Sequence, residues 1–172
     1  MAALHPDPAF DRELRRSLAV VNRGAAAVGD VLDVARRVRT GDIGGWEREW
    51  QRIADRALAS GDDLLGADDL DGACRAFLRA AEYYRQAGFY SDGASRRTLD
   101  MAHVNAFRAA MALLPVLAEI VEIAGISGAA ARDGESQVLR GYLFPGGRRR
   151  GPIRMATTNF AVSFRELIRL RS

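Results

Sequence analysis

The sequence is poor in the residues that most often build a catalytic or metal centre. It contains one cysteine, Cys74, two histidines and no lysine, so that all 25 basic residues are arginines. A single cysteine excludes an intrachain disulfide and favours a reducing compartment. The two histidines and the cysteine also lie too far apart to predict a zinc site, because zinc ligands usually come in closely spaced pairs. We therefore expect no metal and no cofactor.

Long apolar runs are missing as well. The most apolar stretch, 109–118, covers about ten residues and is followed by Glu119 and Glu122, whereas a membrane-spanning helix needs about 20 apolar residues. The first ten residues have neither a positively charged start nor an apolar run, so they do not predict a targeting signal. These absences predict a soluble, cytoplasmic protein without membrane contact.

Acidic residues are scarce at one end of the chain. Residues 135–172 carry eight arginines against two glutamates, while the rest carries 17 arginines against 20 acids. The segment Arg148–Arg150 has no aromatic residues interleaved, so it supports at most non-specific contact with phosphates. Since the main body has no basic excess, we expect no specific nucleic-acid partner.

The first two thirds of the sequence show the periodicity of helices. Apolar residues recur at steps of three and four, and Asp7-Pro8, Gly41 and Gly88 are typical of helix ends. Asp62–Asp71 is predicted to be an acidic loop, and His5 to lie at an untethered terminus. Arg48, Arg52 and Arg56 form a predicted exposed column. The expected helices are 7–22, 26–38, one that begins after Gly44-Gly45, one from Leu70 to Gly88, and one from about Ser95 to Pro115.

The pattern changes after Pro115. Residues 119–123 alternate and are β-branched, and 137–144 and 152–158 are further candidate strands. A short helix is predicted for 164–170. The change from helices to strands predicts two structural units, 1–115 and 116–172.

Nucleophilic catalysis has little support in the residues. The string most similar to a G-x-S-x-G elbow surrounds Ser127 but ends in alanine, and it is followed by an alanine-rich stretch. His103 and Cys74 lie on apolar faces of predicted helices, where a core role is the simpler interpretation. We expect no catalytic residue in this chain.

The segment from Trp46 to Tyr90 combines aromatic residues with small ones. It is typical of a packed helical hairpin. A sharper interpretation is that Tyr83, Tyr84, Phe89 and Tyr90 also line a substrate pocket at the end of the helix. A tetratricopeptide-like unit is a competing interpretation, because such repeats use paired helices of this composition. No second copy follows at the required spacing, and a single unit cannot form a solenoid.

Three groups of residues together resemble a known family. They are the pair Trp46 and Trp50, the run F-L-R-A-A-E-Y-Y-R-Q-A-G-F from Phe77 to Phe89, and G-Y-L-F from Gly141 to Phe144. The chain resembles the N-terminal part of bacterial α/β hydrolases with a helical domain before the catalytic core. This group includes hydrolases of the 2,6-dihydropseudooxynicotine type and esterases of the fermentation–respiration switch type.

The resemblance implies a mainly α fold, with a helical cap domain at 1–115 followed by a few strands of an incomplete α/β-hydrolase sheet at 116–172. In such proteins the cap shapes the substrate pocket, and the Ser, Asp and His of the triad follow later in the chain. Phe160 and Ala161 correspond to a remnant of the oxyanion loop, where the family's glycine and aspartate are replaced.

These implications lead to one main expectation and one alternative. The main expectation is a truncated family member that cannot hydrolyse ester, amide or C–C bonds alone, because acyl transfer needs a nucleophile, a base and an oxyanion hole together. Its partners would be a second copy, paired through exposed strand edges, or a separate chain with the hydrolase core. The alternative is a small helical interaction module whose basic tail contacts an acidic partner.

Overall fold

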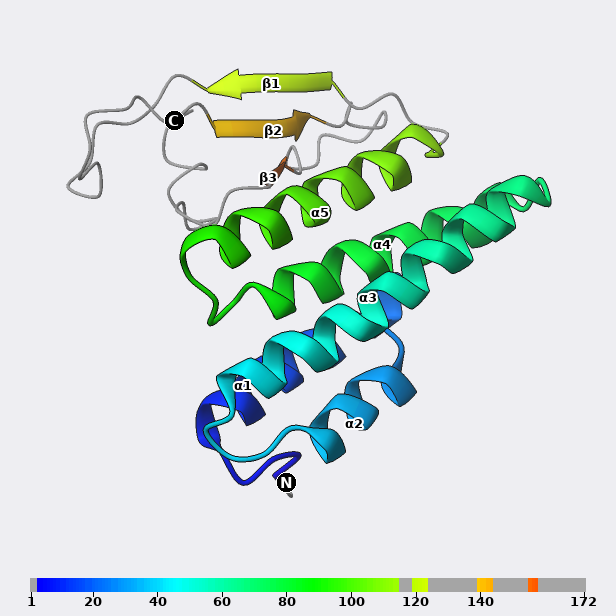
Figure 1. The fold of residues 1–172 in the computed structure, drawn as a ribbon. Helices are drawn as coiled ribbons and strands as arrows, with labels where there is room; N and C mark the ends of the chain where they lie inside the picture. The colour runs from blue at the N-terminus through cyan, green and yellow to red at the C-terminus, as the bar shows by residue number, and fades with distance from the viewer. Residues whose placement is uncertain (1–2, 115–118, 124–138, 144–154, 158–172) are drawn as a thin grey trace, which may run out of the picture. The chain divides into compact units, whose positions relative to one another are not determined.

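The chain forms two compact units, Met1–Leu114 and Pro115–Ser172. The computed structural model describes residues 3–114, 119–123, 139–143 and 155–157, with side chains up to residue 114. The prediction of a mainly helical protein is confirmed (Figure 1). The helices of the first unit are α1 (Pro8–Leu18), α2 (Val28–Arg37), α3 (Ile43–Gly66), α4 (Leu70–Ala87) and α5 (Gly93–Ala112), with a short 3₁₀ turn η1 (Val21–Arg23) after α1.

Three of the helices begin at an aspartate whose carboxylate accepts backbone hydrogen bonds. Asp7 accepts from the N–H groups of Ala9 and Phe10, at 2.9 and 3.3 Å. Asp42 and Asp69 each accept from the N–H of a glycine three residues later, at 2.7 and 2.8 Å. These bonds satisfy N–H groups that the first turn of a helix leaves without partners, and therefore fix where α1, α3 and α4 start.

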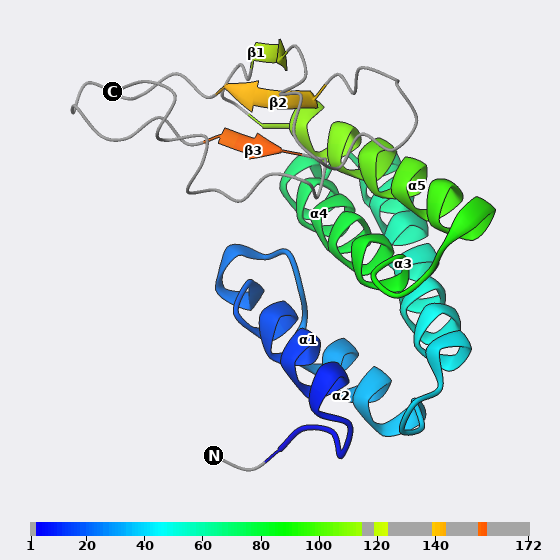
Figure 2. The ribbon, with the colours of Figure 1, turned by 90° about the vertical axis from the view of Figure 1, so that its left-hand side faces the viewer.

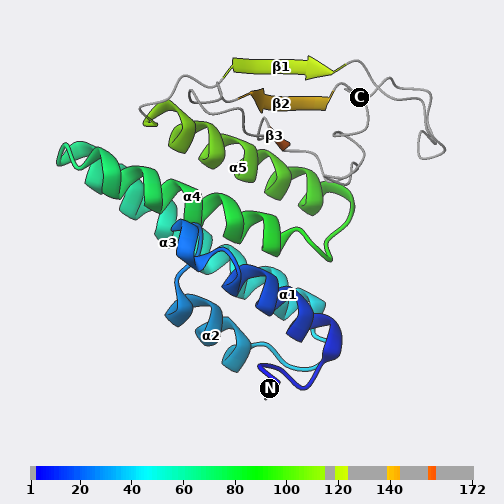
Figure 3. The same ribbon diagram turned by 180° about the vertical axis from the view of Figure 1, so that it is seen from behind.

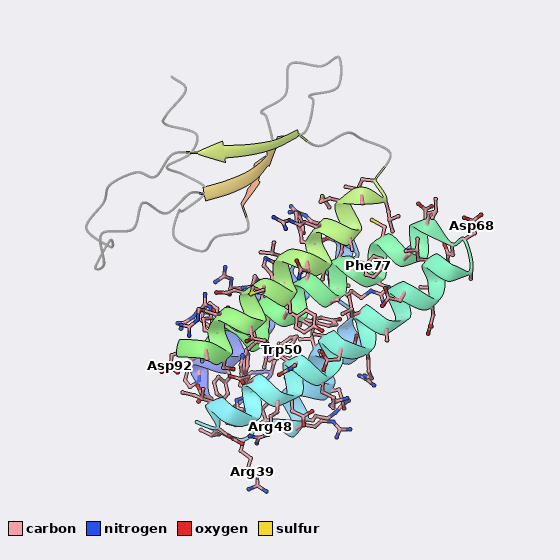
Figure 4. The ribbon with its side chains drawn as sticks, turned by 45° about the horizontal axis from the view of Figure 1, so that its top comes forward. Arg39, Arg48, Trp50, Asp68, Phe77 and Asp92 are labelled. Carbon is pink, nitrogen blue, oxygen red and sulfur yellow. The ribbon has the colours of Figure 1, made fainter. Side chains whose placement is uncertain are left out.

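Helix α4 lies between α3 and α5, and the three helices run side by side (Figures 1 and 3). Alanines at positions 73, 76, 80, 81 and 87 make the buried faces of α4 narrow. In Figure 4 Phe77 lies near the α3–α4 turn, which carries Asp68, whereas Trp50 lies nearer the start of α3. The small residues let the helices approach closely, while the large rings fill the space between them.

Helices α1 and α2 lie next to each other and complete the core (Figure 2). Phe10 and Leu14 of α1, together with Val31 and Val34 of α2, are at most 3% exposed and belong to the same buried cluster as Trp46 of α3. A second, smaller cluster surrounds Phe77 near the α3–α4 turn. The first unit therefore has a hydrophobic core of its own.

Two local expectations are wrong. Asp62 and Asp63 belong to the last turns of α3 rather than to a loop, because that helix continues to Gly66 with both aspartates exposed to solvent. His5 is not at an untethered terminus: it is 4% exposed, its Nε2 lies 3.0 Å from the Val38 carbonyl oxygen, and its Nδ1 accepts from the Asp7 N–H at 3.0 Å. The imidazole thereby ties the N-terminal segment to the end of α2.

The predicted arginine column is exposed at Arg48 and Arg56 but only partly at Arg52. The Arg52 guanidinium donates to Glu49 on its own helix and to Asp33 on α2, each at 2.9 Å. The Arg48 guanidinium lies 3.9 Å from the Asp42 carboxylate at the start of α3, where Figure 4 labels it. Arg52 thus joins α2 to α3, a role that the sequence pattern did not indicate.

The described strands of the second unit form an antiparallel sheet in the order β1-β2-β3. They are β1 (Glu119–Ile123), β2 (Leu139–Leu143) and β3 (Met155–Thr157). Glu119 pairs with Leu143 in the first ladder, and Gly141 pairs with Thr157 in the second. The predicted helix 164–170, Arg148–Arg150 and Ser127 lie outside the described residues. Among the described helices, none combines the length and apolarity that crossing a bilayer requires.

Candidate functional site

Aromatic rings gather where α3 begins and α4 ends. The Trp46 ring lies 4.6 Å from the Phe10 ring, 5.6 Å from the Trp50 ring and 5.5 Å from the Tyr90 ring, measured between centroids. The Trp50 ring in turn lies 5.6 Å from Tyr83. Tilted and edge-on contacts at these separations are the favourable arrangements for aromatic pairs. The cluster therefore joins α1, α3 and α4 into one rigid end of the unit.

Tyr83 and Tyr84, two of the four predicted pocket residues, lie in the core. Tyr83 is fully buried, and its hydroxyl donates to Asp30 at 2.9 Å and accepts from the Ala27 N–H at 2.8 Å. Tyr84 donates to Asp55 at 2.6 Å. Burial, followed by the neighbouring carboxylates, raises the pKa of both phenols far above the ordinary value. Both hydroxyls therefore remain protonated and act as donors that fix α2 and α3 on α4.

Phe89 and Tyr90, the other two, are half-buried just beyond the C-terminal end of α4. Their rings meet edge-on at 4.9 Å, and the Tyr90 ring also lies 5.4 Å from Phe10. Burial, followed by the charge of Glu13, raises the pKa of Tyr90. Of the four residues, only these two are partly exposed to solvent, at the edge of the aromatic cluster. The role of all four as a pocket wall stays a prediction, and Phe160 and Ala161 lie outside the described residues.

A buried polar network beside the rings was missed by the sequence analysis. The Ser17 hydroxyl donates to Glu82 at 2.9 Å and accepts from the Gln86 Nε2 at 2.7 Å, while the backbone carbonyl oxygen of Gln86 accepts from the Trp46 indole N–H at 2.7 Å. Ser17, Gln86 and Glu13 are at most 2% exposed. A signal did exist, because Glu13 and Ser17 follow Phe10 and Leu14 at helical spacing on one face of α1.

The histidines and the cysteine take structural roles. The His103 Nδ1 lies 2.8 Å from the Ala81 carbonyl oxygen, and burial lowers the pKa of this imidazole. The Cys74 thiol donates to the Ala110 carbonyl oxygen at 3.4 Å, and burial raises its pKa. Within the described residues, neither histidine is bonded to a serine or cysteine, and no three metal-binding side chains come together.

Comparison with known proteins identifies hydrolases as relatives. The 20-hydroxy-prefusarin hydrolase FUS2 of Gibberella moniliformis is 35% identical over 118 residues, which cover 66% of this chain and 28% of that protein. The hydrolyase poxO of Penicillium oxalicum is 38% identical over 80 residues, or 46% of this chain and 19% of that protein. The chain therefore spans less than a third of the length of these relatives. No family model matches the sequence.

The fold points to the same group. The crystal structure of 2,6-dihydroxy-pseudo-oxynicotine hydrolase, an α/β hydrolase, superimposes with a TM-score of 0.53 at 19% identity, covering 75% of this chain and 34% of that one. Identity this low supports a shared fold alone. Together with the sequence relatives, it confirms the resemblance found from Trp46, Trp50 and the run after Phe77. The chain is thus similar in sequence to a part of several hydrolases, and its fold resembles a part of this hydrolase structure.

Proposed function

We propose that the helical unit is the cap of an α/β hydrolase, which closes over an active site and shapes its substrate pocket. We further propose that residues 116–172 supply the first strands of the hydrolase sheet. The observation that carries the proposal is the 35% identity to a hydrolase over 118 residues, in a chain whose described side chains form no nucleophile–histidine pair. A segment that is related to hydrolases, and whose described residues pair no nucleophile with a histidine, fits a lid.

The reaction would then depend on residues beyond these 172. Hydrolysis of an ester, amide or C–C bond needs a nucleophile, a base and an oxyanion hole within hydrogen-bond reach of one another. We propose that another part of the same protein or a separate hydrolase core chain supplies them. The relatives found are hydrolases, so they lend no support to the alternative of a helical interaction module.

The border of the aromatic cluster is the proposed contact with substrate. Phe89 and Tyr90 are half-buried at the C-terminal end of α4, where rigid neighbours hold both rings. An apolar wall fixed by packing favours substrates with apolar or aromatic groups next to the scissile bond. Tyr83 and Tyr84 would act indirectly, because their hydrogen bonds to Asp30 and Asp55 hold α4 in position.

The first experiment assays the 172-residue chain with p-nitrophenyl esters of increasing acyl length. We expect no turnover above that of the Ser127→Ala variant, because both histidines lie at hydrogen-bond distance from backbone carbonyl oxygens of the helical unit. Turnover that is lost in Ser127→Ala would contradict a purely capping role for this chain.

The second experiment transfers the segment to an active enzyme. The part of the Gibberella FUS2 hydrolase that matches this chain is replaced by the matching residues of the present chain. Hydrolysis by this chimera is then measured for esters of different size. We expect a folded chimera with an altered substrate preference, and a further change in KM for Tyr90→Ala. Arg39→Ala, at an exposed position, is the control. A folded chimera with unchanged preference and no response to Tyr90→Ala would refute the proposal.

A further inference from the structure

Three buried polar atoms between α1 and the end of α4 have no hydrogen-bond partner among the described residues. They are the Glu13 Oε2, the Gln86 Oε1 and the Tyr90 hydroxyl oxygen. Glu13 is 2% exposed and Gln86 is fully buried. Buried polar atoms almost always have a partner, and leaving one without any destabilises the folded state. A cluster of three such atoms therefore indicates a site for something that bonds to them.

The three side chains occupy one place in the fold. The Gln86 Nε2 donates to the Glu13 backbone carbonyl at 3.3 Å, which puts the amide directly beside α1. Tyr90 follows Gln86 by four residues, and its ring packs on Phe10, one helical turn before Glu13. The charge of Glu13 also acts on the Tyr90 phenol. The three atoms without partners thus belong to side chains that meet where α1 packs against the end of α4.

Neighbouring arginines do not supply the missing bonds. The Arg16 Nη1 lies 3.5 Å from the Glu13 Oε2, and the Arg12 Nε lies 3.9 Å from the Oε1. Both arginine side chains are more than half exposed, at 56% and 70%. Ion pairs of this length between a buried carboxylate and solvated guanidinium groups are weak. The Glu13 Oε2 therefore still lacks a short hydrogen bond.

The donors and acceptors of the cluster match one water molecule. The Glu13 carboxylate and the side-chain Oε1 of Gln86 are acceptors, whereas the Tyr90 hydroxyl can donate. We propose that a single buried water binds here, donates its two hydrogens to Glu13 and Gln86, and accepts from Tyr90. Three bonds are the usual number for an internal water. The water would link α1 to the end of α4 next to the Ser17–Glu82–Gln86 network.

A double-mutant cycle on the full 172-residue chain tests the shared water. Tyr90→Phe removes one partner of the water, and Glu13→Met removes another while roughly preserving side-chain volume. With the water present, Tyr90→Phe should raise the unfolding equilibrium constant about three- to tenfold in the native background and leave it unchanged or lower it in Glu13→Met. If Tyr90→Phe is neutral or stabilising in both backgrounds, the hydroxyl has no bound water and the proposal is wrong.

A crystal structure of the full chain separates the water from a direct bond. We expect electron density for a water within 3.2 Å or so of the Gln86 Oε1 and of at least one of the other two atoms. A direct Tyr90–Glu13 hydrogen bond without water would also couple the two substitutions, but it would overturn the proposal. If Glu13→Met does not fold, Tyr90→Phe alone and the crystal structure still decide between these outcomes.

Discussion

At the scale of single residues, Gly61 sets how closely α3 approaches α4. It lies in the interior of α3, and a Cβ at this position would overlap the Phe77 ring. Glycine normally weakens a helix by about 1 kcal/mol relative to alanine. Its presence here is explained by the flat contact with the aromatic ring, which no other residue type allows.

Gly61→Ala should therefore destabilise the protein by about 1–3 kcal/mol, because the overlap outweighs the gain in helix propensity. Gly66→Ala is the matched control: it lies at the end of the same helix, and a Cβ there would meet nothing within 4 Å. The control should be neutral or slightly stabilising. Chemical denaturation of both variants checks the prediction, and equal effects of the two substitutions would contradict it.

The tyrosine hydroxyls in the core predict a pH dependence of stability. The folded state raises the pKa of Tyr83 and Tyr84 above the ordinary value of 10.0. The unfolded chain then loses these protons first, so the contribution of the two tyrosines to the free energy of unfolding should be constant below about pH 10 and fall as the pH rises above it. In a Cys74→Ala background, which removes the thiol titration, Tyr83→Phe/Tyr84→Phe should show a smaller fall. Urea denaturation at pH 8 to 11 measures the difference.

At the scale of elements, the Asp7 cap was readable from the sequence and the tether of α1 was not. Asp7-Pro8 is a local signal, because the cap and the first helical residue are neighbours in the chain. The bond of His5 to Val38 joins residues 33 apart, and no local pattern specifies such a partner. Asp62 and Asp63 were misread because charged residues occur on the exposed face of a helix as readily as in a loop.

Loss of the α4 cap should be measurable. Asp69→Ala removes the acceptor for the Gly72 N–H and should cost about 1 kcal/mol. Asp68 is a neighbouring exposed aspartate whose side chain does not cap α4. Asp68 has a φ of 61°, so alanine adds backbone strain there. Asp68→Gly is therefore the better control. Thermal unfolding with a lower melting temperature only for Asp69→Ala would agree with the assigned cap.

The candidate site was predictable only in part, because helical spacing is a local signal whereas hydrogen-bond partners on other helices are not. The aromatic residues of α3 and α4 stood out at helical spacing, so their gathering was expected. Their division into core and border was not, since it depends on Asp30 and Asp55, which bind the two tyrosine hydroxyls from other helices. Glu13 and Ser17 lay on an apolar face of α1, but their polar character concealed their burial.

At the scale of the whole molecule, the division at Leu114 predicts that the helical unit is independent. Residues 1–114 contain both buried clusters, so this fragment should unfold in a single cooperative transition when expressed alone. A fragment without cooperative unfolding, monitored by circular dichroism, would show that residues 115–172 are needed for its fold.

The full chain should associate with itself more strongly than this fragment. Within the described residues, β1 and β3 each pair on one side only, and unpaired strand edges favour pairing with another chain. Analytical ultracentrifugation should therefore find monomers for residues 1–114 and larger species for the 172-residue chain. A full chain that remains monomeric at the same concentration would argue against association through the strands.

Both tryptophans of the protein, Trp46 and Trp50, are at most 1% exposed and lie in the helical unit. Tryptophan fluorescence consequently reports on the helical unit and not on the strands. The emission of the native chain should lie at the short wavelengths of indoles shielded from solvent, and its red shift would time the opening of the helices separately from any event elsewhere in the polypeptide.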